Sequence, residues 1–151
     1  MKDFTLNNGV KMPAIGLGTW PYKGDELISV MDMAWELGYR HFDTAWLYKN
    51  ESDIGSFIRQ RKINREDIFL TSKLSLNDMY WRGYYHRFNF RLRVKSVRKA
   101  YEDTCRRLGV DYVDLYLIHW PFPGYLKMWE EYLHISKKSN FARFLRKKIT
   151  S

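Results

Sequence analysis

The 151-residue chain is 45% hydrophobic and 17% aromatic, so it can bury the core of one globular domain, which excludes a disordered protein. It has no apolar run near the roughly 20 residues of a membrane helix and no secretory signal, which argues against a membrane or secreted protein and for a cytoplasmic one. The net charge of +9 comes from residues 81–99, with seven basic residues, and residues 137–151, with six; neither segment contains an acidic residue. The rest of the chain has a net charge of −4, which excludes a uniformly basic domain.

The first expected element is a β-hairpin over residues 4–13. Its short apolar arms flank Asn8-Gly9, a pair that tolerates positive φ. A buried strand over residues 14–20 follows, and its glycines indicate that another backbone or a ligand comes close. Residues 25–37 then place apolar side chains at helical spacing, and Gly38 is positioned to end that helix.

The alternation of strand and helix then repeats along the chain. Further strands are expected over residues 40–45, 67–73 and 112–119, and the last is apolar enough to be covered on both faces. Helices are expected around residues 54–58, 94–108 and 126–135. The single cysteine, Cys105, lies on the apolar stripe of the second of these helices, which favours an inert buried thiol and a reducing compartment.

Four alternations of strand and helix predict an α/β fold with a parallel sheet and right-handed crossovers. The pattern alone leaves open a doubly wound sheet and one half of an eight-stranded barrel. Asp43, Lys73 and His119 each sit where a strand ends and a loop begins, the face on which barrel enzymes build their sites. No G-x-G-x-x-G follows the first strand, which argues against the dinucleotide-binding fold.

Four segments resemble signatures of the aldo-keto reductase family, in order and on successive strands. They are Gly16-Leu17-Gly18-Thr19-Trp20, residues 42–51, Thr71-Ser72-Lys73-Leu74 and Leu117-Ile118-His119-Trp120-Pro121. The resemblance covers residues 1–78 and 94–123. It implies a single incomplete domain over residues 1–151: the N-terminal half of a (β/α)8 TIM-type barrel of about four βα units, preceded by the hairpin. It also implies an oxidoreductase that reduces an aldehyde or ketone with NADPH.

The chemistry of carbonyl reduction fits these residue types. A hydride must arrive from one side, and a proton must reach the developing alkoxide. A phenol, with an ordinary pKa of about 10, gives up a proton more readily beside an ammonium, which a carboxylate can anchor. On this interpretation Tyr48 is the general acid, Lys73 tunes it and Asp43 anchors Lys73. His119 orients the carbonyl oxygen.

Binding residues follow from the same resemblance. Gly18, Thr19 and Asp43 would lie at the nicotinamide end of the cofactor, and no metal site is expected. The apolar substrate pocket would be lined by Trp20, Trp46, His119 and Trp120. The tryptophans could equally be plain core aromatics. Taken singly, each catalytic candidate is also a common structural residue, and only the joint pattern favours the family.

The chain departs from the family pattern in three places. The family's later cofactor-binding motifs have no counterpart, residues 79–93 form a divergent loop, and residues 127–151 form a divergent basic tail. We therefore expect a truncated reductase with weak or absent turnover. Aromatic residues alternate with arginines in residues 79–93, a composition that can bind single-stranded nucleic acid, but we favour a drifted loop and expect no nucleic acid partner.

Two further expectations concern partners. The alternative function is that of a basic interaction protein, binding nucleic acid or anionic surfaces through residues 81–99 and 137–151. A half-barrel leaves two open strand edges and an uncovered apolar layer. We therefore expect self-association, as a homodimer or an aggregate.

Overall fold

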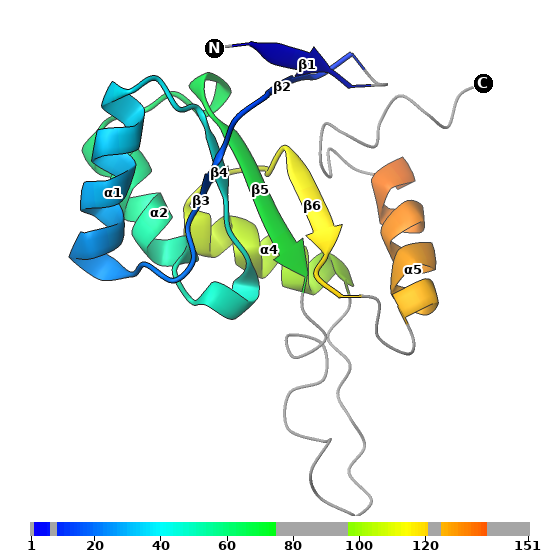
Figure 1. The fold of residues 1–151 in the computed structure, drawn as a ribbon. Helices are drawn as coiled ribbons and strands as arrows, with labels where there is room; N and C mark the ends of the chain where they lie inside the picture. The colour runs from blue at the N-terminus through cyan, green and yellow to red at the C-terminus, as the bar shows by residue number, and fades with distance from the viewer. Residues whose placement is uncertain (1, 7–8, 75–96, 121–124, 139–151) are drawn as a thin grey trace, which may run out of the picture.

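The computed structural model describes residues 2–6, 9–74, 97–120 and 125–138. Strands β1 (Asp3–Thr5) and β2 (Lys11–Pro13) pair antiparallel, with Phe4 opposite Met12. Gly9 takes a φ of 80° in the connection, a conformation that costs a glycine little. The predicted hairpin is confirmed, and it lies across the end at which the strands of the main sheet begin (Figure 1).

The main sheet has four parallel strands in sequential order: β3 (Leu17–Gly18), β4 (His41–Asp43), β5 (Phe69–Leu74) and β6 (Leu115–Ile118). Their connections hold helices α1 (Gly24–Glu36), α2 (Glu51–Gln60) and α4 (Val97–Leu108), and α5 (Tyr125–Lys138) follows β6. Two short 3-10 helices, η1 (Trp46–Tyr48) and η2 (Arg65–Asp67), precede α2 and β5. The helices pack on one face of the sheet (Figure 1), as expected when neighbouring parallel strands are joined by right-handed crossovers.

This order decides between the two folds that the sequence left open. A doubly wound sheet reverses its strand order and places helices on both faces, whereas a barrel adds each strand beside the previous one. The chain therefore folds as the first four βα units of a (β/α)8 barrel. The expected α/β class and half-barrel are confirmed.

The core lies between the sheet and its helices. Alternation along each strand turns Phe42, Leu70 and Tyr116 toward the helices, where they are 0–3% exposed. The helical side of this cluster contains Leu27, Met31, Ile54, Phe57, Val97, Tyr101, Leu108, Met128 and Tyr132. The opposite strand positions, among them Asp43 and Lys73, face the inside of the barrel.

Three details of the predicted strands need correction. The buried strand expected over residues 14–20 is only Leu17–Gly18, and Ile15 and Trp20 are 54% and 59% exposed. The prediction that strand 112–119 is covered on both faces is wrong: Tyr116 packs against Tyr101 and Tyr132, but Leu117 is 39% exposed. The physical reason is that the helices cover one face, and the described residues form no second layer over the other. In the first strand, Gly16 makes room for a side chain, because a Cβ there would lie 2.7 Å from Nδ1 of His41.

Gly55 allows close packing of α2 on α4. A Cβ at this position would lie 2.6 Å from the carbonyl oxygen of Leu108 and 2.9 Å from that of Arg107. We expect Gly55→Ala to lower the free energy of unfolding by about 1–3 kcal/mol, since the two helices must separate. Urea denaturation followed by circular dichroism measures this. Gly18→Ala, which adds a Cβ with nothing within 4 Å, is the matched control, and equal stability of the two variants would contradict the prediction.

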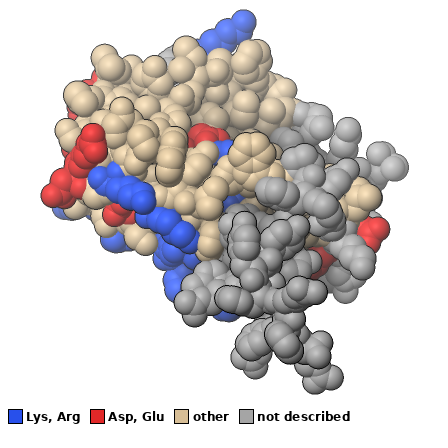
Figure 2. All heavy atoms as spheres, turned by 60° about the horizontal axis from the view of Figure 1, so that its bottom comes forward, with Lys and Arg blue, Asp and Glu red and all other residues tan. Residues whose placement is uncertain are grey.

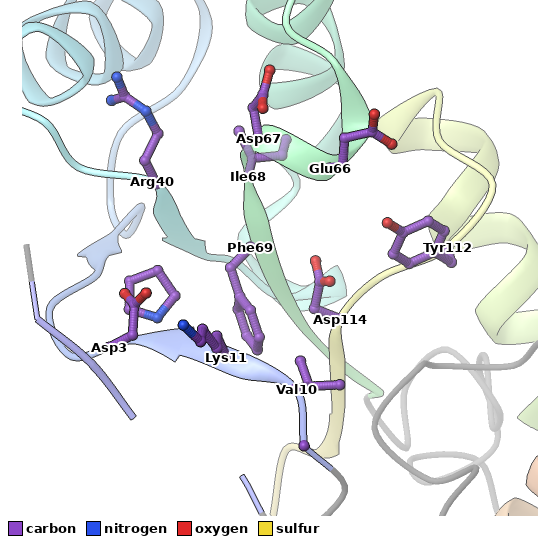
Figure 3. A pocket seen from close by; sticks show the side chains of 12 residues that line it. Asp3, Val10, Lys11, Arg40, Glu66, Asp67, Ile68, Phe69, Tyr112 and Asp114 are labelled. Atoms are coloured by element: carbon purple, nitrogen blue, oxygen red, sulfur yellow. The ribbon is translucent and has the colours of Figure 1, made fainter. Parts of the chain in front are cut away.

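A cavity of about 540 Å³ lies at the end of the sheet where the strands begin, under the hairpin. Figure 3 shows Val10 and Lys11 of the hairpin on one side of it, with Phe69 and Asp114 on the other. The Asp114 carboxylate accepts hydrogen bonds from Arg65 at 2.6 Å and from the Leu70 amide at 2.8 Å. Asp114 is therefore committed to joining β5 to the segment before β6.

Several predicted segments lie partly or wholly outside the described residues. The divergent loop at residues 79–93 is one, and the basic tail beyond residue 138 is another. Among the helices that are described, none has the length and apolar character needed to cross a membrane.

Candidate active site

Four predicted catalytic residues meet at the end of the sheet where the strands finish. Asp43 is the last residue of β4, Lys73 is the next-to-last residue of β5, and His119 directly follows β6. Tyr48 is the last residue of η1, in the connection after β4. Because parallel strands finish at one edge, residues that are far apart in the sequence converge there.

Lys73 and Asp43 form an ion pair inside this edge. Thr71 pairs with Asp43 across the two strands, and Lys73 is two residues further on the same face. The Lys73 ammonium donates to Asp43 Oδ1 and, at 3.1 Å, to the carbonyl oxygen of Thr44. With the Lys73 side chain only 15% exposed, the ammonium is held at a defined place.

Tyr48 sits beside this ion pair. Lys73 Nζ lies 5.2 Å from the centre of the Tyr48 ring, within the range of a cation–π contact. The ring centre is 5.4 Å from that of Trp20 and 5.7 Å from that of His119, whose plane is turned by 81°. A phenol, an ammonium, a carboxylate and an imidazole therefore share one small region.

The surroundings of His119 favour its neutral form. Its pKa is lowered chiefly by burial and also by the positive charge of Lys73, while Asp43 partly opposes the shift. The ring stacks on Trp120 at 5.5 Å, and the backbone amide of His119 donates to the carbonyl of Leu74 at 2.9 Å. Its Nδ1 is buried and has no hydrogen-bond partner among the described residues. A neutral imidazole can donate one hydrogen bond to a carbonyl oxygen without delivering a full charge.

The predicted aromatic residues differ in their surroundings. Trp20 and Trp120 are 59% and 55% exposed, so neither is a plain core aromatic. Trp46 is half-buried, and the ammonium of Lys49 lies 3.0 Å from its ring centre. Figure 2 turns this end of the molecule forward: acidic and basic atoms lie together near its centre, surrounded by uncharged ones. The arrangement suits a polar reacting group with an apolar body.

The residues predicted to bind the cofactor separate into two kinds. Gly18 pairs with Asp43, and a Cβ at Gly18 would meet nothing within 4 Å, so its backbone is open to a ligand. Thr19 is fully buried, and its hydroxyl donates to the Asp43 carbonyl at 3.0 Å. Gly18 thus leaves its backbone uncovered beside Asp43, whereas Thr19 joins the ends of β3 and β4.

Sequence reasoning missed two polar residues at this site. Asn50 and Glu51 end the second signature segment, yet no role was expected for either, and they are 0% and 2% exposed. Their signal in the sequence is a polar pair shortly before the apolar helical stripe that contains Ile54, Phe57 and Ile58. Their side chains hold together elements whose approach no local pattern encodes.

The two inward-facing histidines predict a dependence of stability on pH. Burial lowers the pKa of His41, whose Nε2 lies 2.9 Å from Thr71 Oγ1, and that of His119 is lowered as well. A lowered pKa in the folded state means that the unfolded chain binds more protons between the two values. The stabilisation is complete above the ordinary value near 6.5 and is lost as the pH falls through the folded-state value.

We therefore expect the melting temperature to fall as the pH is lowered from neutral to mildly acidic. Circular dichroism melts of the parent and of His41→Asn check this, since acidic residues contribute equally to both. The melting temperature of His41→Asn should fall less than that of the parent over the same pH interval. Equal losses would show that His41 does not contribute.

Comparisons with known proteins agree with this geometry. The family model described as "Aldo/keto reductase family" matches residues 14–139. Methylglyoxal reductase DkgA of Escherichia coli O157:H7 is 37% identical over 136 residues, covering 88% of this chain and 44% of that protein. The solved aldo/keto reductase from Brucella melitensis gives a TM-score of 0.75 at 36% identity, over 93% of this chain and 50% of that one.

A second solved structure carries a bound cofactor. It is an aldo-keto reductase (AKR2E5) complexed with NADPH, with a TM-score of 0.74 and 29% identity, over 93% of this chain and 45% of that one. The chain spans half or less of the length of these relatives. The matched range of residues 14–139 includes residues 79–93, and the predicted boundaries of the divergent segments remain predictions.

Proposed function

This chain belongs to the aldo/keto reductase family, and we propose that its site reduces a small aldehyde or ketone to the alcohol, with NADPH as the cofactor. The observation that carries the proposal is the Lys73–Asp43 ion pair lying against Tyr48 and His119. NADPH, when bound, supplies the hydride. Gly18 and Asp43 are the residues that we assign to its nicotinamide end.

Tyr48 and Lys73 handle the proton. The Tyr48 hydroxyl gives its proton to the alkoxide oxygen that forms as the carbonyl carbon is reduced. The ammonium of Lys73 then stabilises the negative charge left on the phenol oxygen, since it is held close to the ring by Asp43. A proton from solvent restores the phenol, so one carbonyl, one hydride and one proton yield one alcohol.

His119 and the exposed tryptophans position the substrate. As a neutral imidazole, His119 donates a hydrogen bond to the carbonyl oxygen and polarises it. Trp20 and Trp120 offer exposed apolar surface on either side of Tyr48 and His119. We therefore assign Trp20, Trp120 and the half-buried Trp46 to the body of the substrate, which suits a small carbonyl compound with apolar substituents.

The test is cofactor binding followed by turnover. NADPH is titrated into the purified chain while tryptophan fluorescence is recorded, and NADPH oxidation is then followed with methylglyoxal and with benzaldehyde. We expect saturable quenching and carbonyl-dependent oxidation at a low rate, because the chain spans half or less of the length of its relatives. Oxidation without a carbonyl compound serves as the blank. An absence of quenching up to millimolar NADPH would contradict the proposal.

We also propose that copies of the chain self-associate. Within the described part of the sheet, β3 and β6 are each paired on one side only, and Leu117 and Trp120 are exposed near the second edge. Open parallel edges with apolar side chains favour association. Light scattering after gel filtration should give a mass above the 18.3 kDa of one chain. A single species of that mass would contradict the proposal.

We place the protein in the cytoplasm. The support is its single cysteine, Cys105, which leaves no second cysteine for a disulfide within the chain and so fits a reducing compartment. Imaging of a fluorescent fusion tests this placement.

A further inference from the structure

Asn50 and Glu51 anchor the turn that carries Tyr48. Tyr48 ends η1, Lys49 takes a left-handed φ of 59°, and α2 begins at Glu51. Neither the 3-10 turn nor Lys49 belongs to the hydrogen-bonded ladder of the sheet. Backbone hydrogen bonds from Tyr48 to Ala45 and from Lys49 to Trp46 shape the turn itself. Side chains around this junction connect the turn to the neighbouring strands.

Asn50 ties the junction to the ends of β3 and β4. The two hydrogens of its side-chain nitrogen are shared among the Thr19 carbonyl at 3.1 Å, the Thr19 hydroxyl at 3.2 Å and the Tyr22 carbonyl at 3.0 Å. Its side-chain oxygen accepts from the Thr44 hydroxyl at 2.7 Å. Thr19 flanks Trp20, and Thr44 follows Asp43. Asn50 thus spans the two segments on one side of the Tyr48 ring.

Glu51 ties the same junction to β5 and α4. One carboxylate oxygen accepts from the Ser72 hydroxyl at 2.7 Å, and the other accepts from Nε of Arg107 at 2.6 Å. Ser72 directly precedes Lys73 and points to the opposite face of the strand. The bond from Glu51 to Ser72 is therefore a short connection between the turn of Tyr48 and the strand of Lys73.

The side chains of Asn50 and Glu51 are buried, and burial of such polar groups is stable only when they are hydrogen-bonded. An unpaired amide or carboxylate at such positions would cost more than it contributes, so the observed partners define one placement of the turn. We infer that Asn50 and Glu51 are positioning residues, which hold the Tyr48 ring at its distance from Lys73, Trp20 and His119. The catalytic consequence rests on the proposed reductase function; the geometric claim does not.

The test removes single hydroxyl partners and leaves Asn50 and Glu51 in place. Thr44→Val keeps the volume of Thr44 and removes the bond to Asn50, and Ser72→Ala removes the bond to Glu51. Thr44→Ser restores a hydroxyl in the first case. Ser56→Ala is the matched control for the second, since Ser56 is on the exposed side of α2, where it donates to the Ser52 carbonyl.

The first measurement is nuclear Overhauser contact between ring protons of Tyr48 and those of Trp20 and His119 in the full-length chain. We expect both contacts to weaken in Thr44→Val and Ser72→Ala and to persist in Thr44→Ser and Ser56→Ala. A lower melting temperature with unchanged ring contacts would show that the bonds serve stability alone and would overturn the inference. The measurement needs no turnover.

The second measurement separates kcat from KM for NADPH-dependent reduction. A displaced proton donor lowers kcat by about tenfold or more while KM changes little, because substrate binding does not require the phenol. If the parent chain has no turnover, the proposed function fails and the ring contacts still decide the positioning role. An unchanged kcat together with unchanged ring contacts in Thr44→Val and Ser72→Ala would overturn the inference that Asn50 and Glu51 position Tyr48.

Discussion

Tyr48→Phe should remove carbonyl-dependent NADPH oxidation almost completely, with a fall in kcat of roughly 10²- to 10⁴-fold, the range expected for loss of a general acid. The substitution removes one oxygen atom and keeps the ring. The packing of that ring on Trp20 and His119, with centres 5.4 and 5.7 Å away, does not require the hydroxyl. We therefore expect an unchanged fold and unchanged NADPH binding.

The comparison with a second tyrosine makes this result specific. Tyr39 packs against the core beside the start of β4, at the far end of the strand from Asp43. Tyr39→Phe removes the same atom there and should leave turnover at the parent's level. Steady-state rates and fluorescence titrations of both variants provide the test. Equal turnover in Tyr48→Phe and the parent would remove Tyr48 from the proposed role.

Arg107→Met should produce the largest loss of stability among the single changes considered, a decrease in the free energy of unfolding of about 3 kcal/mol. Arg107 pairs with Glu51 at 2.6 Å, and the Glu51 side chain is only 2% exposed. Removing the guanidinium leaves a carboxylate away from water with Ser72 as its one remaining partner among the described contacts. The Arg107 side chain is itself partly exposed, so water can replace some of the loss, and the effect stays at the lower end of the range.

The exposed ion pairs of Arg61 are the control for this prediction. Arg61 joins α2 to Asp32 and Glu36 of α1, also at 2.6 Å, but in contact with solvent. Arg61→Met should therefore change stability far less than Arg107→Met, since solvent screens such pairs. Urea denaturation compares the two. Combining Glu51→Gln with Arg107→Met should restore part of the loss, and a purely additive result would contradict the buried-charge explanation.

The local pattern of the sequence predicts most of the elements, and the joint pattern of four segments predicts the four catalytic candidates. The strand expected over residues 14–20 is the exception, since only Leu17–Gly18 form it. Apolar spacing at residues 27, 31 and 34 predicts α1, and those side chains are buried in the core. Asp43, Lys73 and His119 were identified as strand-end residues because turns and polar residues mark where an apolar strand finishes. These features depend on neighbours within a few positions, which a single sequence displays.

Contacts between distant segments were decided only by the tertiary structure. Sequential strand order with helices on one face settled the half-barrel against the doubly wound sheet. The bonds that join Thr19 to Asp43, Asn50 to Thr19 and Glu51 to Ser72 each connect residues more than twenty positions apart. The type of a residue sets how many hydrogen bonds its side chain can donate and accept. Which partner makes those bonds, and so which role the residue has, is determined by how the strands and helices pack.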